Sequence, residues 1–266
     1  MIPGARTIPF VKVSACGNDF LLIDADLAPP NINDFTRRIC DRHQGVGADG
    51  VEWMCPHSEA NVQIRLINAD GSEAEISGNG TRCVAAYICA TQSKEKISIL
   101  TGAGIKICSL TSHQDAEYEF EMEMGKPSVE TELDLKFEGT EVRGIPVSMG
   151  NPHYVVFVSE FAHDWRFQAA KIQKLPHFTE GVNVEFVAAS SRHDIDVRFF
   201  ERGVGETQSS GTGSCASAVA AMAAGFCESP VRVHAEGGTQ TVRSDGGVIF
   251  LRGTARLICQ GEYLIA

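Results

Sequence analysis

The stretch NADGSEAEISGNGTRC, residues 68–83, decides the fold because ERGVGETQSSGTGSC, residues 201–215, repeats its pattern later in the chain. Adding 133 to a residue number carries residues in and around the first stretch onto the second. The matched pairs are Arg65 and Arg198, Glu73 and Glu206, Ser77 and Ser210, Gly78 and Gly211, Gly80 and Gly213, and Gly17-Asn18 and Gly150-Asn151. Coincidences at a single offset predict two halves that share one fold.

Each half places a short Ser-Gly-x-Gly loop before an apolar run rich in small residues. The runs are CVAAYICA at 83–90 and CASAVAAMAAGFC at 215–227. A helix that is apolar on all sides belongs in the protein interior. Its first amide groups lack partners within the helix and can bind an anion. The pattern therefore predicts one buried helix in each half, with an anion site at its start.

The rest of the chain reads mainly as strands and turns. Strands are expected at 8–24, interrupted by a turn at 15–18, and at 145–158, interrupted by a turn at Asn151 and His153. Further strands are expected at 61–67, 97–101, 105–110, 117–123, 181–189 and 195–200, with hairpins at Gly237-Gly238 and Asp245-Gly246-Gly247. Two outer helices are expected, one beginning after Asn33 as its cap and one near 164–174. The polar residues 125–143 are expected to link the halves. These features predict an α+β fold with domains at 1–130 and 131–266, each a sheet wrapped around a helix.

Composition excludes several functional classes. The net charge is −11 and the pI is about 5.2, which argues against nucleic acid or an anionic membrane as a partner. No apolar stretch is long enough to span a membrane, and the N-terminus lacks the apolar core of a secretory signal, so a cytoplasmic protein is expected. The nine cysteines are scattered without CxxC, so most should be buried and reduced.

Motifs for metals and dinucleotides are weak. The eight histidines show neither HExxH nor HxH spacing, so no metal site is expected. The run GVGADG at 45–50 satisfies GxGxxG, but it follows a basic helix end and no apolar helix begins at Gly50. We therefore predict no dinucleotide site there.

Several polar residues lie at turns or strand ends: Asn18, Asn68, Asn151, Asn183 and the pair Glu201-Arg202. Any one asparagine alone is better explained as a turn former. Together with two helix N-termini, the set describes a cleft between the halves that suits a small zwitterion. The N-termini would hold one carboxylate and Arg202 a second, while Glu201 and the amides would hold ammonium groups.

Six stretches of the chain carry a family resemblance: both serine stretches, GNDF (17–20), DRHQGVGAD (41–49), SMGNPH (148–153) and VNVEF (182–186). In chain order and over nearly the whole length, they resemble the corresponding stretches of diaminopimelate epimerases. The likeness is closer than to the proline racemases and phenazine-pathway isomerases that share the fold. It implies two pseudo-symmetric domains, each a β-barrel-like sheet around a central helix, with the active site in the cleft between them. It also implies interconversion of LL- and meso-diaminopimelate without pyridoxal phosphate, other cofactor or metal.

The resemblance assigns residue roles as well. It implies that Asn18, Asn68, Asn151, Asn183, Glu201 and Arg202 bind the distal end of a small dicarboxylic diamino acid, that Gly78-Asn79 and Gly211-Thr212 hold the reacting carboxylate, and that His153 and Glu206 flank the catalytic positions Ser77 and Ser210. It allows a homodimer. Gly50 stands where some members carry a polar binding residue.

The two catalytic positions depart from the family, which has cysteine at both. A thiol titrates near 8.5 and an alkyl hydroxyl near 15.7, so forming an alkoxide costs roughly 10 kcal/mol more than forming a thiolate. A neighbouring base recovers about 10²–10⁴-fold of the rate.

Three interpretations stay open. They are an epimerase with both cysteines replaced and slow or absent turnover, a related isomerase or dehydratase acting on another substrate, and a non-catalytic amino-acid-binding protein. The retained binding residues favour the first over the second, but they do not separate the first from the third.

Overall fold

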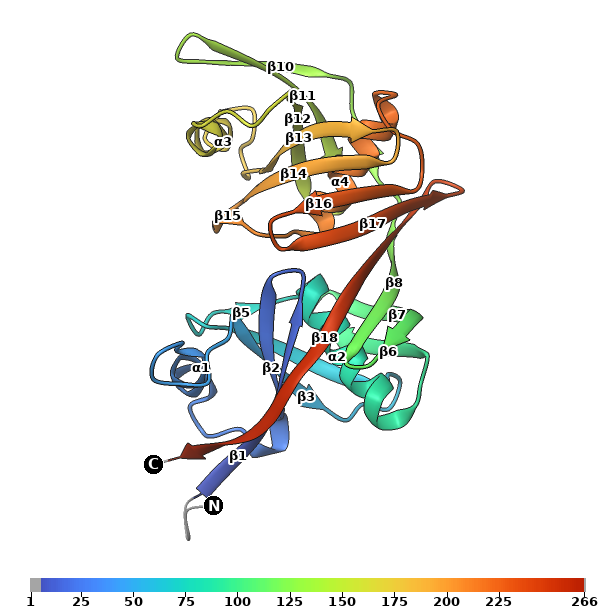
Figure 1. The fold of residues 1–266 in the computed structure, drawn as a ribbon. Helices are drawn as coiled ribbons and strands as arrows, with labels where there is room; N and C mark the ends of the chain where they lie inside the picture. Colours follow the sequence, from blue (N-terminus) through green and yellow to red (C-terminus); the bar gives the residue numbers. More distant parts are fainter. Residues whose placement is uncertain (1–5, 266) are drawn as a thin grey trace. The chain divides into compact units, whose positions relative to one another are not determined.

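The computed structural model describes residues 6–265, which divide into two compact units (Figure 1). Unit 1 comprises residues 1–122 and 253–266, and unit 2 comprises residues 123–252.

Unit 1 is a ring of strands around one helix. Its elements are β1 (Arg6–Ala15), β2 (Asn18–Asp24), η1 (Ala25–Leu27), α1 (Ile32–Cys40), β3 (Gly50–Cys55), β4 (Val62–Asn68), β5 (Glu73–Ala74), α2 (Gly78–Gln92), β6 (Lys96–Thr101), β7 (Gly104–Gln114), most of β8 (Glu117–Gly125) and the end of β18 (Val248–Ile265). The pairings β1–β2–β3–β4–β6–β7–β8–β18–β1 close the ring. The helix α2 lies inside it and α1 outside (Figure 1).

Unit 2 repeats this order of strands with a central and an outer helix. Its elements are β9 (Ser128–Val129), β10 (Leu133–Phe137), β11 (Thr140–Ser148), β12 (Pro152–Phe157), α3 (Trp165–Ile172), β13 (Asn183–Ser191), β14 (Asp194–Glu201), β15 (Gly205–Thr207), α4 (Gly211–Ala223), β16 (Val231–Ala235), β17 (Gly238–Asp245) and the start of β18. The strands follow the order β11–β12–β13–β14–β16–β17–β18, with β9 and β10 both pairing with β11.

The offset of 133 recurs in the strand register. In unit 1, Phe20 pairs with Gly50 in parallel, and in unit 2 His153 pairs with Asn183 in the same way. The register of the next two strand pairs is also conserved: Val51 with Ile67 and Ile67 with Glu73 in unit 1, and Val184 with Phe200 and Phe200 with Glu206 in unit 2. Since register sets which side chains share a face, the two units present equivalent positions to their central helices. The predicted α+β fold with an internal repeat is confirmed.

The predicted linker at 125–143 is wrong, because the region forms strands of unit 2. Leu135 and Val142 are buried there, and their strands β10 and β11 pair through a two-residue turn. Both turn residues, Glu138 and Gly139, have positive φ (48° and 81°), which matches the twist of a tight hairpin. The polar residues of this segment face outward on strands whose other face is covered.

The end of the chain also differs from the predicted domain boundary. The sequence places residues 131–266 in one domain, but residues 253–266 belong to unit 1. There, β18 pairs antiparallel with β1 from Arg6 to Ser14 and covers what would otherwise be a sheet edge.

The central helices confirm the prediction from their composition. Nine residues of α2 and nine of α4 are buried, including both cysteines that begin the apolar runs. The outer helix α1 instead packs one face, with Phe35 and Ile39, against Trp53. Its cap is Asn31, which accepts from the Asp34 amide, and not Asn33 as predicted; Asn33 donates to the Gly71 carbonyl instead.

The nine cysteines are free thiols. Six of them are buried, Cys55 and Cys89 are half-buried, and Cys259 is exposed. Most of them therefore serve as small apolar core residues, as predicted. Among residues 6–265, no helix combines the length and apolarity that crossing a membrane requires.

Candidate active site

Ser77 begins the central helix of unit 1. Its backbone is extended (φ −121°, ψ 122°), and its Oγ accepts a hydrogen bond from the Gly80 amide at 3.0 Å. This is N-cap geometry, which serine favours because its short side chain reaches the unpaired amides of the first turn. A side chain added at Gly78 would meet nothing within 4 Å, so the start of the helix is open. The predicted carboxylate loop Gly78-Asn79 lies at this opening.

Two predicted binding residues meet beside this loop. Asn79 Nδ2 donates to Asn18 Oδ1 at 2.7 Å, and Asn18 Nδ2 donates to Asp49 Oδ2 at 3.0 Å. Arg82, which is fully buried, donates to Asn79 Oδ1. Asn68 lies at the end of β4, where its Nδ2 donates to Ser72 Oγ at 3.0 Å. Unit 1 therefore brings Asn18 and Asn79 together, while Asn68 is held by its own turn.

Ser210 repeats this arrangement in unit 2. It caps α4 with an extended backbone (φ −143°, ψ 127°), and its Oγ accepts from the Gly213 amide at 3.2 Å. Gly211 and Thr212 form the first turn, and Asn151 Nδ2 donates to Thr212 Oγ1 at 3.4 Å. The two serines thus occupy equivalent positions at the positive ends of equivalent helices.

A buried hydrogen-bonded chain supports the α4 cap. His153 Nδ1 lies 2.7 Å from Glu185 Oε1, and His153 Nε2 lies 3.0 Å from Asn151 Oδ1. Both His153 and Glu185 are only 1% exposed. Asn183 sits beside His153 in the parallel register, and its Oδ1 accepts from the Arg202 amide at 2.9 Å. Unit 2 therefore brings together most of its predicted binding residues.

Glu201, not Glu206, is the acidic side chain at Ser210. Burial raises the pKa of Glu201, and the Ser210 hydroxyl and His153 partly offset that rise. The Glu206 carboxylate instead forms an ion pair with Arg166 of α3 at 2.6 Å. The structure therefore pairs Glu206 with Arg166, whereas the resemblance predicts that Glu206 flanks a catalytic serine.

Arg202 lies on the surface of unit 2. Its Nη1 donates to the Glu180 carbonyl at 2.7 Å, and its aliphatic carbons lie against Gly181. The guanidinium is therefore oriented by backbone contacts before any ligand arrives.

Sequence reasoning missed two buried glutamates, Glu52 on β3 and Glu185 on β13, which are related by the offset of 133. Their signal is a single carboxylate inside an otherwise apolar strand, in GVEW and in NVEF. Burial raises the pKa of both, and that of Glu52 reaches about 8. Both point at the first turn of the central helix, because a Cβ built on Gly80 would overlap Glu52 Oε1 and one on Gly213 would lie 2.9 Å from Glu185 Oε1.

We expect Gly80→Ala to destabilise the protein by about 1–3 kcal/mol, because the added methyl group would overlap the Glu52 carboxylate and lie 3.3 Å from Ser77 Cβ. Gly78→Ala is the matched control in the same turn, where the methyl group meets nothing within 4 Å. Urea unfolding of both variants measures the difference. Equal stabilities would contradict the close approach at Gly80.

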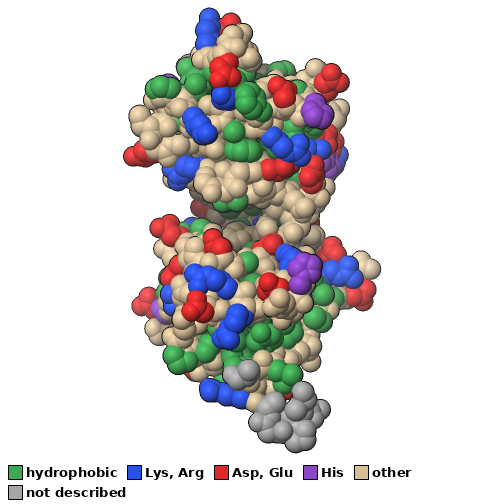
Figure 2. Space-filling view, turned by 90° about the vertical axis from the view of Figure 1, so that its left-hand side faces the viewer, with side chains coloured by type: hydrophobic (Ala, Val, Ile, Leu, Met, Phe, Trp, Pro, Cys, Tyr) green, Lys and Arg blue, Asp and Glu red, His purple; other side chains and the backbone are tan. Residues whose placement is uncertain are grey.

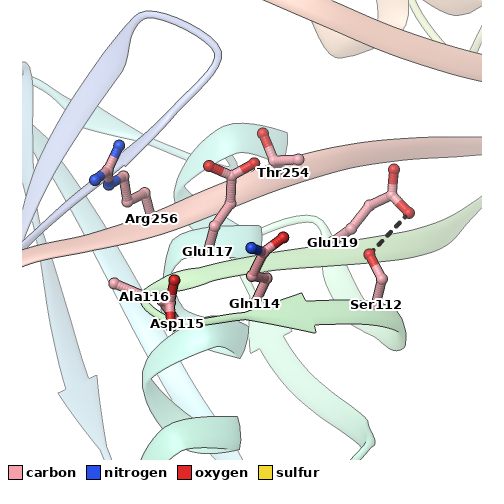
Figure 3. Close-up of a pocket in the computed structure, with 8 residues that line it drawn as sticks. All are labelled: Ser112, Gln114, Asp115, Ala116, Glu117, Glu119, Thr254 and Arg256. Carbon is pink, nitrogen blue, oxygen red and sulfur yellow. Dashed lines mark hydrogen bonds between the residues drawn. The ribbon is translucent and has the colours of Figure 1, made fainter.

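A separate hollow of about 490 Å³ lies along the β7–β8 hairpin and β18 (Figure 3). Its lining includes Asp115, Glu117 and Glu119 with one basic residue, Arg256, and none of the predicted site residues. Glu119 is held by Ser112 and Thr111. Elsewhere, the face in Figure 2 shows acidic and basic side chains interspersed. No cluster of three His, Cys, Asp or Glu within residues 6–265 could hold a metal ion.

Comparison with known proteins identifies the family of this chain. The family model described as diaminopimelate epimerase matches residues 10–130 and 145–258. The chain is 35% identical to the diaminopimelate epimerase of Pelotomaculum thermopropionicum, with 96% of this chain and 98% of that protein covered. It is 34% identical to the diaminopimelate epimerase of Bacillus velezensis, again with 96% and 98% covered.

Solved structures share the fold at low identity. A phenazine biosynthesis protein of the PhzF family from Bacillus anthracis superposes with a TM-score of 0.76 at 18% identity, covering 98% of this chain and 100% of that one. A probable proline racemase from Agrobacterium radiobacter gives a TM-score of 0.70 at 15% identity, covering 96% and 92%. Full-length coverage at these TM-scores shows a common two-unit architecture, and the family match with the sequence identities shows that this chain belongs to the diaminopimelate epimerase family.

Proposed function

We propose that this chain interconverts LL- and meso-diaminopimelate by moving the α-proton, without pyridoxal phosphate or metal. The observation that carries the proposal is the pair of equivalent N-caps, Ser77 on α2 and Ser210 on α4, each followed by a glycine in the first turn of its helix. The amides of these turns would hold the reacting carboxylate. Stereoinversion requires an acid and a base on opposite faces of the α-carbon, so each unit would contribute one serine.

At the α4 cap, the side chains that would assist Ser210 are Glu201 and His153. Glu201 is half-buried and titrates above its ordinary pKa, and His153 is oriented by Glu185. A carboxylate of raised pKa beside the hydroxyl can accept its proton more readily than a solvated one. Asn18, Asn68, Asn151, Asn183 and Arg202 would bind the distal amino-acid end.

A second candidate is a non-catalytic amino-acid-binding protein, favoured by the high pKa of a serine hydroxyl compared with a thiol. A related isomerase or dehydratase acting on a more acidic proton is the third. The experiment that separates them is solvent deuterium incorporation at the α-carbon of diaminopimelate, combined with calorimetric binding. Binding with exchange supports the epimerase, and binding without exchange supports the binding protein.

The proposal also includes a cellular compartment and an oligomeric state for the protein. Nine free cysteines support a reducing compartment, so we place the activity in the cytoplasm. A homodimer stays a prediction, which light scattering in solution tests.

We expect diaminopimelate to bind about 10- to 100-fold more tightly than lysine, because lysine lacks the carboxylate that Arg202 would pair with, and a hydrogen bond to a charged group contributes roughly 1.5–3 kcal/mol. Arg202→Ala should abolish this preference by weakening diaminopimelate alone. The control is Arg232→Ala, which removes an exposed arginine paired with Asp194 and should leave both affinities unchanged. Equal calorimetric affinities for the two ligands in the parent would remove the case for diaminopimelate.

A further inference from the structure

Glu52 is a buried carboxyl group to which the proposed function gives no role. It is 0% exposed, and neither of its oxygens has a hydrogen-bond partner among the described residues. In the sheet it lies between Leu22 on β2 and Leu66 on β4, both buried, with their side chains on the same face. Burying a carboxyl group is costly unless it is hydrogen-bonded, so an unpaired one in these surroundings calls for an explanation, such as a catalytic role.

The two units differ in what supports their caps. The unit 2 cap has Glu201 and His153, but the offset of 133 puts Asn68 and Phe20 at the equivalent positions of unit 1. The buried Glu185 of unit 2, by contrast, has Glu52 as its equivalent in unit 1. Glu52 is therefore the acidic side chain that unit 1 retains at the first turn of α2.

The titratable group that interacts with Glu52 from α2 is Cys83, and burial raises the pKa of that thiol. Arg82 on α2, Cys16 in the β1–β2 turn and Asp19 on β2 also act on Cys83. Arg82 donates to Asn79 and lies 3.6 Å from Cys16 Sγ. The strand neighbours of Glu52, Leu22 and Leu66, are apolar.

Glycine at position 80 lets the carboxyl group approach the cap. A Cβ there would overlap Glu52 Oε1 and lie 3.3 Å from Ser77 Cβ. The cap side chain and the buried carboxyl group thus converge on a residue that has no side chain to separate them.

We propose that Glu52 is a positioning residue that exchanges a proton with Ser77 during catalysis. This inference rests on the proposed function. As the Cα–H bond breaks, Ser77 Oγ takes the α-proton and its own hydroxyl proton passes to an oxygen of Glu52 in its ionised form, while the electron pair stays on the α-carbon and its carboxylate. In the reverse direction Ser77 protonates the α-carbon and Glu52 resupplies the hydroxyl. The Glu52 pKa of about 8 lies near that of an ordinary thiol, so the pair replaces much of the basicity of the missing cysteine.

The test compares Glu52→Gln in two backgrounds, the parent and Ser77→Cys, by deuterium uptake at the α-carbon in D₂O from each stereoisomer. In the parent we expect a loss on the order of 10²-fold, the usual effect of removing a proton-transfer partner, with unchanged calorimetric affinity. In the Ser77→Cys background we expect the exchange rate to fall less than about 3-fold, because a thiol needs no partner to ionise near neutral pH. Glu52→Asp should recover part of the parent rate.

Glu52→Leu guards against misfolding, because leucine matches the residues on either side and should fold at least as well. An equal loss in both backgrounds would show a structural role and overturn the inference, as would a Glu52→Gln variant that exchanges as fast as the parent. If the parent does not bind diaminopimelate, or binds it without exchanging the α-proton, the proposed function itself fails. Calorimetry and deuterium uptake of the parent therefore separate the two failures.

Discussion

Replacing Ser77 and Ser210 together by cysteine is expected to raise the rate of diaminopimelate epimerisation on the order of 10³-fold. The hydroxyl titrates about seven units above a thiol, and a neighbouring base recovers about 10²–10⁴-fold of that deficit. The helices add to the gain, because a thiol at a helix N-terminus ionises more easily than a free one. Both positions are N-caps, so the two new thiols would have this advantage.

Replacing either serine alone should raise the epimerisation rate much less. Inversion needs a base on one face and an acid on the other, so one thiol facing one serine still leaves a step that depends on a hydroxyl. A single variant should nevertheless exchange the α-proton of the stereoisomer whose hydrogen faces the thiol. Circular dichroism and deuterium uptake from each stereoisomer measure both effects.

The control is Ser93→Cys, which adds a thiol at the opposite end of α2 and should leave the rate unchanged. A parent that epimerises as fast as the double variant would show that serine suffices as acid and base. A double variant that binds but never inverts the substrate would favour another reaction or a binding protein.

The second large effect concerns stability and pH. The folded-state pKa of Glu52 is about 8, against an ordinary value of 4.5, because burial disfavours the ionised form. Between those values the folded protein binds the proton that the unfolded chain has lost, so stability falls as pH rises. The contribution of Glu52 is fully present below about pH 4.5 and lost by about pH 8. The loss amounts to about 5 kcal/mol at about 1.36 kcal/mol per unit.

Urea unfolding of the parent and of Glu52→Leu across pH 5 to 9 measures this contribution. We expect the variant to be more stable than the parent at pH 9, and the difference to shrink as pH falls. Glu185 and Glu201 make the same contribution to the pH dependence of the free energy of unfolding in both proteins, so the comparison isolates the contribution of Glu52. Glu117→Gln, which changes an exposed carboxylate, should leave the curve unchanged. Parallel curves for the parent and Glu52→Leu would show that Glu52 titrates normally.

Much of the fold is local and therefore readable from the sequence. The two central helices follow from runs of small apolar residues, and their starts follow from serine and glycine. The turn at Gly17, with φ of 84°, and the hairpins near Gly238 and Gly246 follow from glycine, which accepts positive φ. The offset of 133 predicts the repeat, and the strand register obeys it.

The remaining features depend on contacts distant in sequence. The pairing of β18 with β1 joins the two ends of the chain, and no local pattern near residue 253 specifies that partner. Glu206 pairs with Arg166 across 40 residues, so its position in a motif did not reveal its partner. The sequence alone determined the repeat, the caps and the family resemblance, because each rests on neighbouring residues. Only the tertiary structure decided that Glu201 lies at Ser210 and that Glu52 is buried between leucines, because burial and pKa depend on what other strands and helices pack around a side chain.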